Sequence, residues 1–359
     1  MPKSVLKALK AAVFFCIGFI IFYLVYKRQN KSYQEECLFK NIPLSDCSLV
    51  DKVWSDMQNA DYYWIGVILL LFMITNLIRA LRWKMMFKSM GYSPRNINLF
   101  GTIMVNYLAN LGIPRSGEII RAGLVSNYEN IPLEKVLGTI FTDRIFDVIC
   151  LAIVLILTLI LGGPEFYNYL NININLSEKL KIFSQYPVIW SLIAVTAAGF
   201  LIWIYRFRYR LLKTSIGQRV WYRIKGFIDG VNSVRNVTSV PLFILYTVLI
   251  WVLYYYMMYL SFSAFKPTAH LGPIEGLVIF AFGSLGILFP SPGGMGSYHM
   301  LVGEGLSMYG ISGSDGFSFA NIVFFSVSVG INVLFGILFL VLLPIINNSK
   351  ESISKSKNV

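Results

Sequence analysis

Charged residues are scarce in this chain of 359 residues: Asp, Glu, Lys and Arg make up 14% of it. A soluble protein of this size carries roughly a quarter. Hydrophobic residues make up 56%, and the mean hydropathy is +0.63. The apolar residues form continuous runs and do not alternate with polar ones, which argues against a β-barrel. We therefore predict an all-α polytopic membrane protein.

Histidine and cysteine are also rare, at two and four residues. The chain contains no Cys-x-x-Cys ligand set, no metal-spaced His/Asp set, no Asp-x-Asp pair, no Ser/His/Asp arrangement and no nucleotide-binding motif. We expect no metal and no cofactor, so any transport would be passive, gradient-coupled or driven by a partner. Cys37 and Cys47 share one polar loop, where a disulfide is expected if the loop is extracytoplasmic.

Positive charge is abundant, at a net +13, and it is confined to particular segments. That distribution favours a membrane protein that obeys the positive-inside rule, and we expect no nucleic-acid partner. The basic segments are the N-terminus, 79–95, 206–235 and the C-terminal tail, which we place in the cytoplasm. The segments 29–61, 162–186 and 310–316 are acidic, balanced or poor in basic residues and are placed outside. Both termini are then cytoplasmic.

Nine apolar segments are candidates for membrane helices, and a full crossing needs about 20 apolar residues. Seven are interpreted as spans: Val5–Tyr26, Tyr62–Ile78, Val136–Leu161, Pro187–Tyr205, Pro241–Phe262, Pro273–Phe289 and Phe317–Ile346. Leu99–Ile113 and Met295–Tyr309 are short and rich in Asn and Gly, so we expect re-entrant or broken helices there. The prediction is about seven or eight transmembrane helices plus one or two re-entrant ones.

The chain divides into four regions, none of them a soluble domain. These are an N-terminal transmembrane helix (1–28), an extracytoplasmic loop (29–61), a transmembrane domain (62–346) and a basic cytoplasmic tail (347–359). The first helix resembles a signal peptide in its basic start and apolar core. No small-x-small cleavage site follows it, so we interpret it as a retained span.

A first group of polar residues and helix breakers lies in and after the short segment Leu99–Ile113. Its members are Asn106, Asn110, Pro114, Arg115, Gly117, Glu118 and Arg121. Charge in hydrocarbon costs roughly 2.5–3.5 kcal/mol per residue, so such groups are kept where they face protein, water or a polar ligand. Arg115, Glu118 and Arg121 are spaced by three and can share a helical face. The pattern fits either a cap where a helix leaves the membrane or a binding site, and we favour the site.

A second group, Asp143, Arg144 and Asp147, lies near the start of a strongly apolar helix. Asp143 and Asp147 are four residues apart and share one helix face. They are candidate partners for Arg115 and Arg121. A buried structural ion-pair network and direct ligand contact are both compatible with the spacing.

A third group combines the helix breakers Pro290, Pro292, Gly293, Gly294 and Gly296 with His299 and Glu304. Free backbone N–H groups at such a break could bind an anion, especially at the start of the next helix. Pro114 and Pro290 each interrupt an apolar helix in one half of the chain. Paired interruptions of this kind are typical of transporters built as inverted repeats, so an inverted repeat is possible here.

Four motifs together resemble the lysylphosphatidylglycerol synthase transmembrane family. They are Arg79-x-x-Arg82-Trp83, Pro114-x-x-Gly117-Glu118-x-x-Arg121, Asp143-Arg144-x-x-Asp147 and Pro290-x-Pro292-Gly-Gly-x-Gly296. The resemblance covers roughly residues 62–345 and implies a helical bundle with re-entrant helices that moves lipids between leaflets. His299 occupies a position that is often Glu in the family. The soluble aminoacyl-transferring domain is absent, so lysine addition to lipid is not expected.

The leading hypothesis is translocation of an anionic lipid, either a phospholipid or a polyprenyl-phosphate-linked lipid, in a bacterial inner membrane. Arg115, Arg121 and Arg144 would hold the phosphate, while Glu118, Asp143 and Asp147 would keep those arginines in place. The breaks at 112–117 and 290–296 would supply hinges. The expected partners are membrane lipids, with a homo-oligomer or an envelope protein also possible.

Two alternatives remain open. The chain could be an integral glycosyl- or acyl-transferase acting on lipid substrates, in which a carboxylate such as Asp143 serves as a base. It could also be a non-transporting partner within a cell-envelope complex. We expect that it is not an enzyme.

Overall fold

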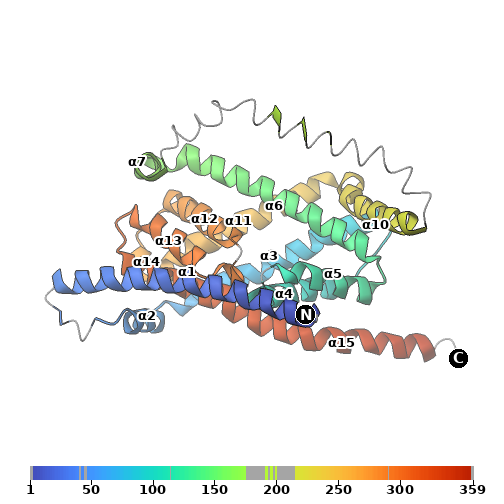
Figure 1. The fold of residues 1–359 in the computed structure, drawn as a ribbon, viewed down its shortest axis with the longest axis horizontal. Helices are drawn as coiled ribbons and strands as arrows, with labels where there is room; N and C mark the ends of the chain where they lie inside the picture. The colour runs from blue at the N-terminus through green and yellow to red at the C-terminus, as the bar shows by residue number, and fades with distance from the viewer. Residues whose placement is uncertain are drawn as a thin grey trace.

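The computed structural model describes residues 3–39, 42–43, 47–113, 115–174, 191–192, 195–196, 199, 215–289 and 291–356. Within these ranges every regular element is a helix, and no strand occurs (Figure 1). The expected span Pro187–Tyr205 falls almost entirely outside the described residues, as do Pro114 and Pro290.

Four described stretches are long and apolar enough to cross a membrane: Tyr62–Ser89, Leu133–Leu161, Val240–Ala264 and Gly313–Asn347. They correspond to α3 (Tyr62–Ser89), α6 (Leu133–Leu161), α11 (Val240–Ser261) with the short turn η4 (Phe262–Ala264), and the consecutive elements α14 (Gly313–Val323), η7 (Phe324–Ile331) and α15 (Asn332–Ser356). Side chains cap the first turns of α3 and α14. The side chain of Asp61 accepts a hydrogen bond from the Tyr63 N–H, and that of Ser312 accepts one from the Asp315 N–H.

Two helical hairpins lie between these long helices. In the first, α4 (Asn96–Gly112) packs against α5 (Ser116–Glu129). In the second, α12 (Pro273–Leu288) packs against α13 (Ser297–Ser307). Both expected re-entrant segments are therefore arms of hairpins. The expected span Pro273–Phe289 corresponds to α12, which extends about 24 Å at 1.5 Å per residue and is shorter than the four candidate spans; the chain then doubles back along it.

The same order of elements occurs in both halves of the chain. In the first half the hairpin α4–α5 lies between α3 and α6, and in the second half the hairpin α12–α13 lies between α11 and α14–η7–α15. Helices α3 and α11 pack side by side, and α4 packs on α15 as α12 packs on α6. Figure 1 shows α12 and α13 at one end of the bundle with α2 and α7 (Gly163–Tyr169), hereafter the α2 end. Hairpin α4–α5 lies nearer the opposite end, hereafter the α10 end, with α10 (Ser215–Asn232) and the C-terminus.

The tips of the two hairpins contact each other. Arg115, at the first tip, donates a hydrogen bond from Nη2 to the backbone oxygen of Leu288 at 3.4 Å, and Leu288 is the last residue of α12. A Cβ atom on Gly293, at the second tip, would lie 2.9 Å from Cδ2 of Leu111. Segments about 180 residues apart in sequence thus approach each other where each hairpin reverses.

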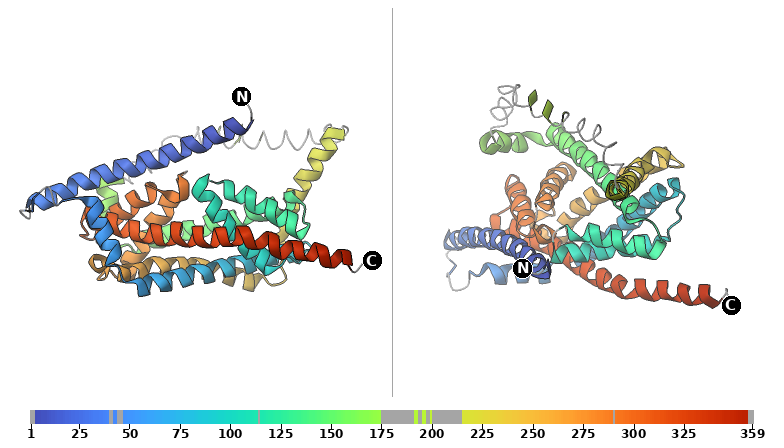
Figure 2. Two further views of the ribbon diagram at one scale, coloured as in Figure 1. Left: turned by 90° about the horizontal axis from the view of Figure 1, so that it is seen from below. Right: turned by 45° about the vertical axis from the view of Figure 1, so that its right-hand side comes forward.

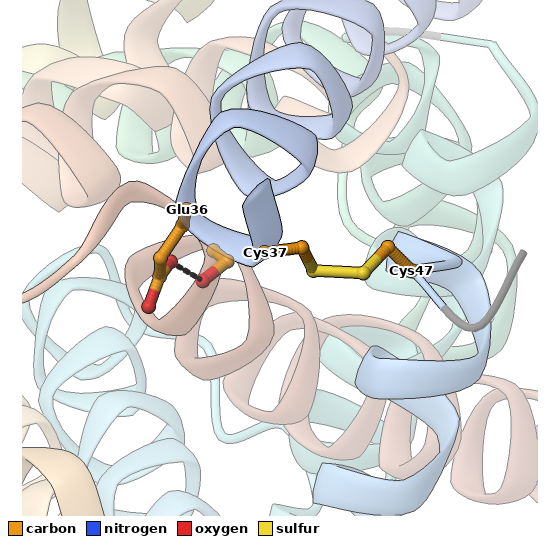
Figure 3. Close-up of a disulfide and its surroundings, with 4 residues drawn as sticks. Glu36, Cys37 and Cys47 are labelled. Atoms are coloured by element: carbon orange, nitrogen blue, oxygen red, sulfur yellow. Dashed lines mark hydrogen bonds between the residues drawn. A yellow bond between two sulfur atoms is a disulfide. The ribbon is translucent and has the colours of Figure 1, made fainter. Parts of the chain in front are cut away.

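The described part of segment 29–61, which was expected to be an extracytoplasmic loop, is largely helical. Helix α1 (Lys3–Phe39) runs into it, and α2 (Leu49–Gln58) lies across the direction of the long helices (Figure 2). The expected disulfide between Cys37 and Cys47 is present, with their Cα atoms 6.4 Å apart (Figure 3). It connects the end of α1 to the start of α2.

Polar contacts tie this disulfide-linked unit to α14. The Ser314 hydroxyl donates to Glu36 at 3.2 Å, a bond drawn in Figure 3. Lys52 Nζ lies 2.7 Å from carboxylate oxygens of both Asp56 and Asp315. Burial alone would lower the pKa of the Lys52 ammonium, but hydrogen bonds to the two carboxylates outweigh it and raise that pKa above its ordinary value.

Close packing of α6 on α10 depends on glycine. A Cβ on Gly138 would lie 2.2 Å from the backbone oxygen of Phe227 and 2.8 Å from Cα of Gly230. We expect Gly138→Ala to destabilise the protein by about 1–3 kcal/mol, because backbone atoms rather than flexible side chains must shift. Gly123→Ala is the matched control, since nothing lies within 4 Å of its Cβ position on α5. Thermal unfolding in detergent should show a lower Tm for Gly138→Ala only, and equal Tm values would contradict this packing.

Candidate functional site

Helices α3 and α6 join through a buried network of ion pairs. Arg79 Nη1 lies 3.2 Å from Asp143 Oδ2 and 3.1 Å from Asp147 Oδ2. Arg82 Nη2 lies 2.5 Å from Asp143 Oδ1 and 3.5 Å from Asp147 Oδ1. The side chains of Arg79, Arg82 and Asp143 are at most 5% exposed. Asp143 therefore pairs with two arginines in the interior of the bundle, one at each carboxylate oxygen.

The network lies deep in the bundle because of where its residues stand in their helices. Arg79 is ten residues before the end of α3 at Ser89, and Asp143 is ten residues after the start of α6 at Leu133. Ten helical residues rise about 15 Å, which is about half the hydrocarbon thickness of a bilayer. The spacing of three between the arginines and of four between the aspartates turns each pair to one helix face.

Helix α11 supplies further hydrogen-bond partners for the two arginines. Arg82 Nη1 donates to the Thr247 hydroxyl at 3.1 Å, and Arg79 Nη2 donates to the Tyr254 hydroxyl at 3.4 Å. Beside them, the Trp83 indole donates from Nε1 to the Thr139 hydroxyl at 2.8 Å. Because these hydroxyls satisfy part of the guanidinium donors, the arginines are held in fixed positions.

The edge of the network is accessible. Arg144 Nε lies 2.6 Å from Glu118 Oε1, and Arg144 Nη1 lies 3.2 Å from Asp147 Oδ2. The Arg144 side chain is 40% exposed and that of Glu118 is 35% exposed. Arg144 therefore links hairpin α4–α5 to α6. Its guanidinium group lies between the buried ion pairs and the surface of the bundle.

Arg121 is buried without an acidic partner. Its side chain is 1% exposed, and its guanidinium carbon lies 3.6 Å from the centre of the Trp83 ring. Its Nε and Nη2 atoms have no hydrogen-bond partner among the described residues. The expected pairing of Arg121 with Glu118 or with the aspartates is wrong, because Glu118 turns to Arg144 and Asp143 is occupied by α3. Cation–π stacking on tryptophan stabilises the guanidinium but leaves N–H donors unused.

The local charge is positive. The arginines 79, 82, 121 and 144 contribute four positive charges and Glu118, Asp143 and Asp147 contribute three negative ones, so the group carries +1 when all are ionised. A buried excess charge is costly and favours binding of an anion. We name these seven residues with Trp83 the arginine cluster.

The other residues expected at the first site lie elsewhere on hairpin α4–α5. Arg115 is exposed at the tip in a left-handed conformation, with φ of 61°, and the expected pair with an aspartate of α6 is wrong because its guanidinium turns to Leu288. The Asn110 side chain accepts from the Gly117 N–H at 2.9 Å, which closes the turn. Asn106 is 1% exposed beside Gly117, where a Cβ would lie 2.2 Å from the Asn106 backbone oxygen. Asn106, Asn110 and Gly117 thus shape the turn.

The third group is separate from the arginine cluster. His299 is 1% exposed, and its ring lies 5.2 Å from that of Phe22 and 4.8 Å from that of Phe324, measured between centroids. Glu304 lies 4.0 Å from the guanidinium of Arg28 in α1. The turn between α12 and α13 begins at η6 (Pro292–Gly294), and Gly293, Gly294 and Gly296 have φ of 60°, 87° and 82°. These residues form the second hairpin tip and its packing against α1.

Sequence reasoning missed Arg79 and Arg82 as site residues. The apolar run ends at Ile78, so hydropathy predicts that both arginines belong to a basic cytoplasmic loop. Helix α3 instead continues to Ser89 and carries them inside. Their spacing in the sequence indicates a helix. Asn76, Arg79 and Arg82 recur every three residues, which would place them on one helical face, whereas a solvated loop needs no such spacing.

The family model described as "Lysylphosphatidylglycerol synthase TM region" matches residues 48–346. This chain belongs to the lysylphosphatidylglycerol synthase transmembrane family. The matched range includes the whole arginine cluster and both hairpins. The family and the apolar helices identify the chain as a multi-pass membrane protein.

Proteins of archaea are among the relatives of this chain. The chain is 26% identical over 271 residues to a UPF0104 membrane protein of Methanothermobacter thermautotrophicus, covering 71% of this chain and 76% of that protein. It is 28% identical over 117 residues to a UPF0104 membrane protein of Methanocaldococcus jannaschii, covering 32% and 34%. It is also 26% identical over 102 residues to the glycosyltransferase AglD of Haloferax volcanii, covering 28% and 16%. No solved structure matches.

In this member of the lysylphosphatidylglycerol synthase transmembrane family, the arginine cluster is expected to depend on Asp143. Asp143→Asn removes the charge that faces Arg79 and Arg82, and breaking a buried pair costs about 3–5 kcal/mol. The measurement is the Tm in detergent. Lys31→Gln is the control, because the Lys31–Glu35 pair is exposed, with side chains 80% and 67% accessible, and should change stability by about 0.5 kcal/mol or less. Similar Tm shifts for the two variants would count against a structural role for Asp143.

Proposed function

We propose that this protein moves lipids with an anionic phosphate head group between the leaflets of a membrane. The observation that carries the proposal is Arg121, a fully buried guanidinium with unused N–H donors in a cluster of net charge +1. Phosphate oxygens accept charge-assisted hydrogen bonds from arginine, often two at once. A phosphate beside Arg121 would neutralise the excess charge.

The physical problem of lipid translocation fits such a cluster. The acyl chains of a lipid can stay in the hydrocarbon layer, while its charged head group needs polar contacts at depth. The acids of the cluster keep the arginines in place and limit the affinity for phosphate, so that a head group can leave again. Arg144 and Glu118, at the accessible edge, provide a contact between the surface of the bundle and the buried guanidinium groups.

The two hairpins supply elements that could open toward opposite sides. They occupy corresponding places in the element order of the two halves, and in transporters built as inverted repeats such paired interruptions lie at a binding site near the bilayer midplane. The proposal covers passive, gradient-coupled and partner-driven movement. We place the protein in the cytoplasmic membrane of its cell.

An enzymatic alternative rests on the match to a protein named as a glycosyltransferase. That match covers 16% of AglD and 28% of this chain. We do not transfer the activity in that name on so small a part of the protein. Sugar or acyl transfer to a lipid remains the outcome that would replace our proposal, and the test below detects it as a changed lipid.

The test uses purified protein in liposomes that contain dye-labelled phosphatidylglycerol, with dithionite to destroy the dye in the outer leaflet. Wild-type protein should expose nearly all of the dye, and Arg121→Gln should slow this by roughly tenfold or more, because a charge-assisted hydrogen bond contributes about 1.5–3 kcal/mol. Dye-labelled diacylglycerol, which lacks the phosphate, should be unaffected by the substitution.

Arg223→Gln is the matched control. It removes the same charge from a side chain that is 75% exposed on α10, and it should leave the rate unchanged. Because Arg121 has no ion pair within the described residues, Arg121→Gln should also lower the Tm far less than Asp143→Asn does. A wild-type rate in folded Arg121→Gln, or chromatography that reveals a modified lipid, would overturn the proposal.

A further inference from the structure

Helix α2 has three different sides. One side packs on α14, with Leu49 fully buried and Lys52 paired with Asp56 and Asp315. A second side is apolar and exposed, with Val50 58% and Trp54 62% accessible. Since residues four apart share a helix face, these two form one continuous patch.

The third side of α2 is polar and exposed. It carries Asp51, Ser55 and Gln58, which fall together at helical spacing and lie next to the Val50–Trp54 side. A helix with a polar side beside an apolar side suits a boundary between water and lipid.

The position of α2 agrees with such a boundary. It lies across the direction of the membrane-spanning helices at one end of the bundle (Figures 1 and 2). Three residues separate α2 from α3, which begins at Tyr62, and the Tyr62 hydroxyl donates to the backbone oxygen of Met57 at 2.8 Å. Helix α2 is therefore at the level where α3 begins to cross.

The exposed surface continues from α2 onto α3. Tyr63, 71% exposed, is followed on α3 by Leu70 at 60%, Ile74 at 39% and Leu77 at 45%, a stripe that in a membrane faces lipid. Trp and Tyr concentrate at membrane–water interfaces because one end of each ring system is apolar and the other is polar. Trp54 and Tyr63 thus mark the same boundary.

We propose that α2 is an interfacial helix whose Val50–Trp54 side lies in the lipid head-group region at the α2 end. The occupant of this face is the bilayer surface. The Cys37–Cys47 disulfide joins α2 to the end of α1, and the Lys52–Asp315 pair holds α2 against α14. This inference does not depend on the proposed transport activity.

The test places single spin labels on the two exposed sides of α2. In a background with Cys16→Ala and Cys150→Ala, and with the Cys37–Cys47 disulfide retained, the variants are Val50→Cys, Trp54→Cys, Asp51→Cys and Ser55→Cys. The protein is placed in vesicles of phosphatidylglycerol and phosphatidylethanolamine. Collisions with oxygen, which concentrates in the bilayer, and with a water-soluble nickel chelate are measured for each label.

We expect the oxygen-to-nickel ratio to be high at 50 and 54 and to be reversed at 51 and 55. Equal nickel accessibility at all four positions would place α2 in water and overturn the inference. Shielding from both reagents at 50 and 54 would show that a protein or a second copy covers the face, which would also overturn it. Val50→Cys and Trp54→Cys report independently, so the result survives if one variant fails to fold.

Discussion

The bridge from Asp143 to Arg79 and Arg82 is the interaction on which the rest of the structure depends. Helices in a membrane gain little from burying apolar surface against each other, because lipid is as apolar as their side chains. Buried charges, in contrast, are tolerated only when they are paired. Asp143 satisfies two arginines at once, and this fixes both the rotation and the depth of α3 relative to α6. The bond from Trp83 to Thr139 connects the same two helices beside it.

This bridge also explains why Arg121 is left without an acid. The buried carboxylate of α6 is committed to α3, and Glu118, one turn before Arg121 on α5, is committed to Arg144. The guanidinium of Arg121 is held instead by the ring of Trp83, which α3 and α6 keep in place. The excess positive charge is therefore a consequence of how the ion pairs are distributed, and no side chain of the described residues satisfies the remaining donors.

Some of this could be predicted from the sequence, and the reason is that some signals are local. Long apolar runs predict membrane helices, and Gly293, Gly294 and Gly296 predict a reversal, since both depend on a few neighbouring residues. Hydropathy assigns Arg79 and Arg82 to a loop because it depends only on the local sequence and contains no information about the acidic residues of α6 that pair with them. It could not separate a crossing from a re-entrant arm at α12, which depends on α13 packing back along it. Spacing put Glu118 and Arg121 on one face, but their partners come from α6 and α3.

The two halves share the same order of helices but differ in the side chains at their hairpins, and this difference limits the possible transport mechanisms. The first half contributes the arginine cluster, whereas the corresponding hairpin of the second half carries His299 packed among the rings of Phe22, Phe317 and Phe324. On the proposed function, an anion would therefore have one buried binding site among the described residues and not two symmetric ones. Because ion pairs hold α3 and α6 together, we expect that proposed site to stay in place while a lipid moves past it. Access from either side must then come from the hairpins, whose tips meet through Arg115 on Leu288 and Leu111 beside Gly293 and not through buried charge pairs.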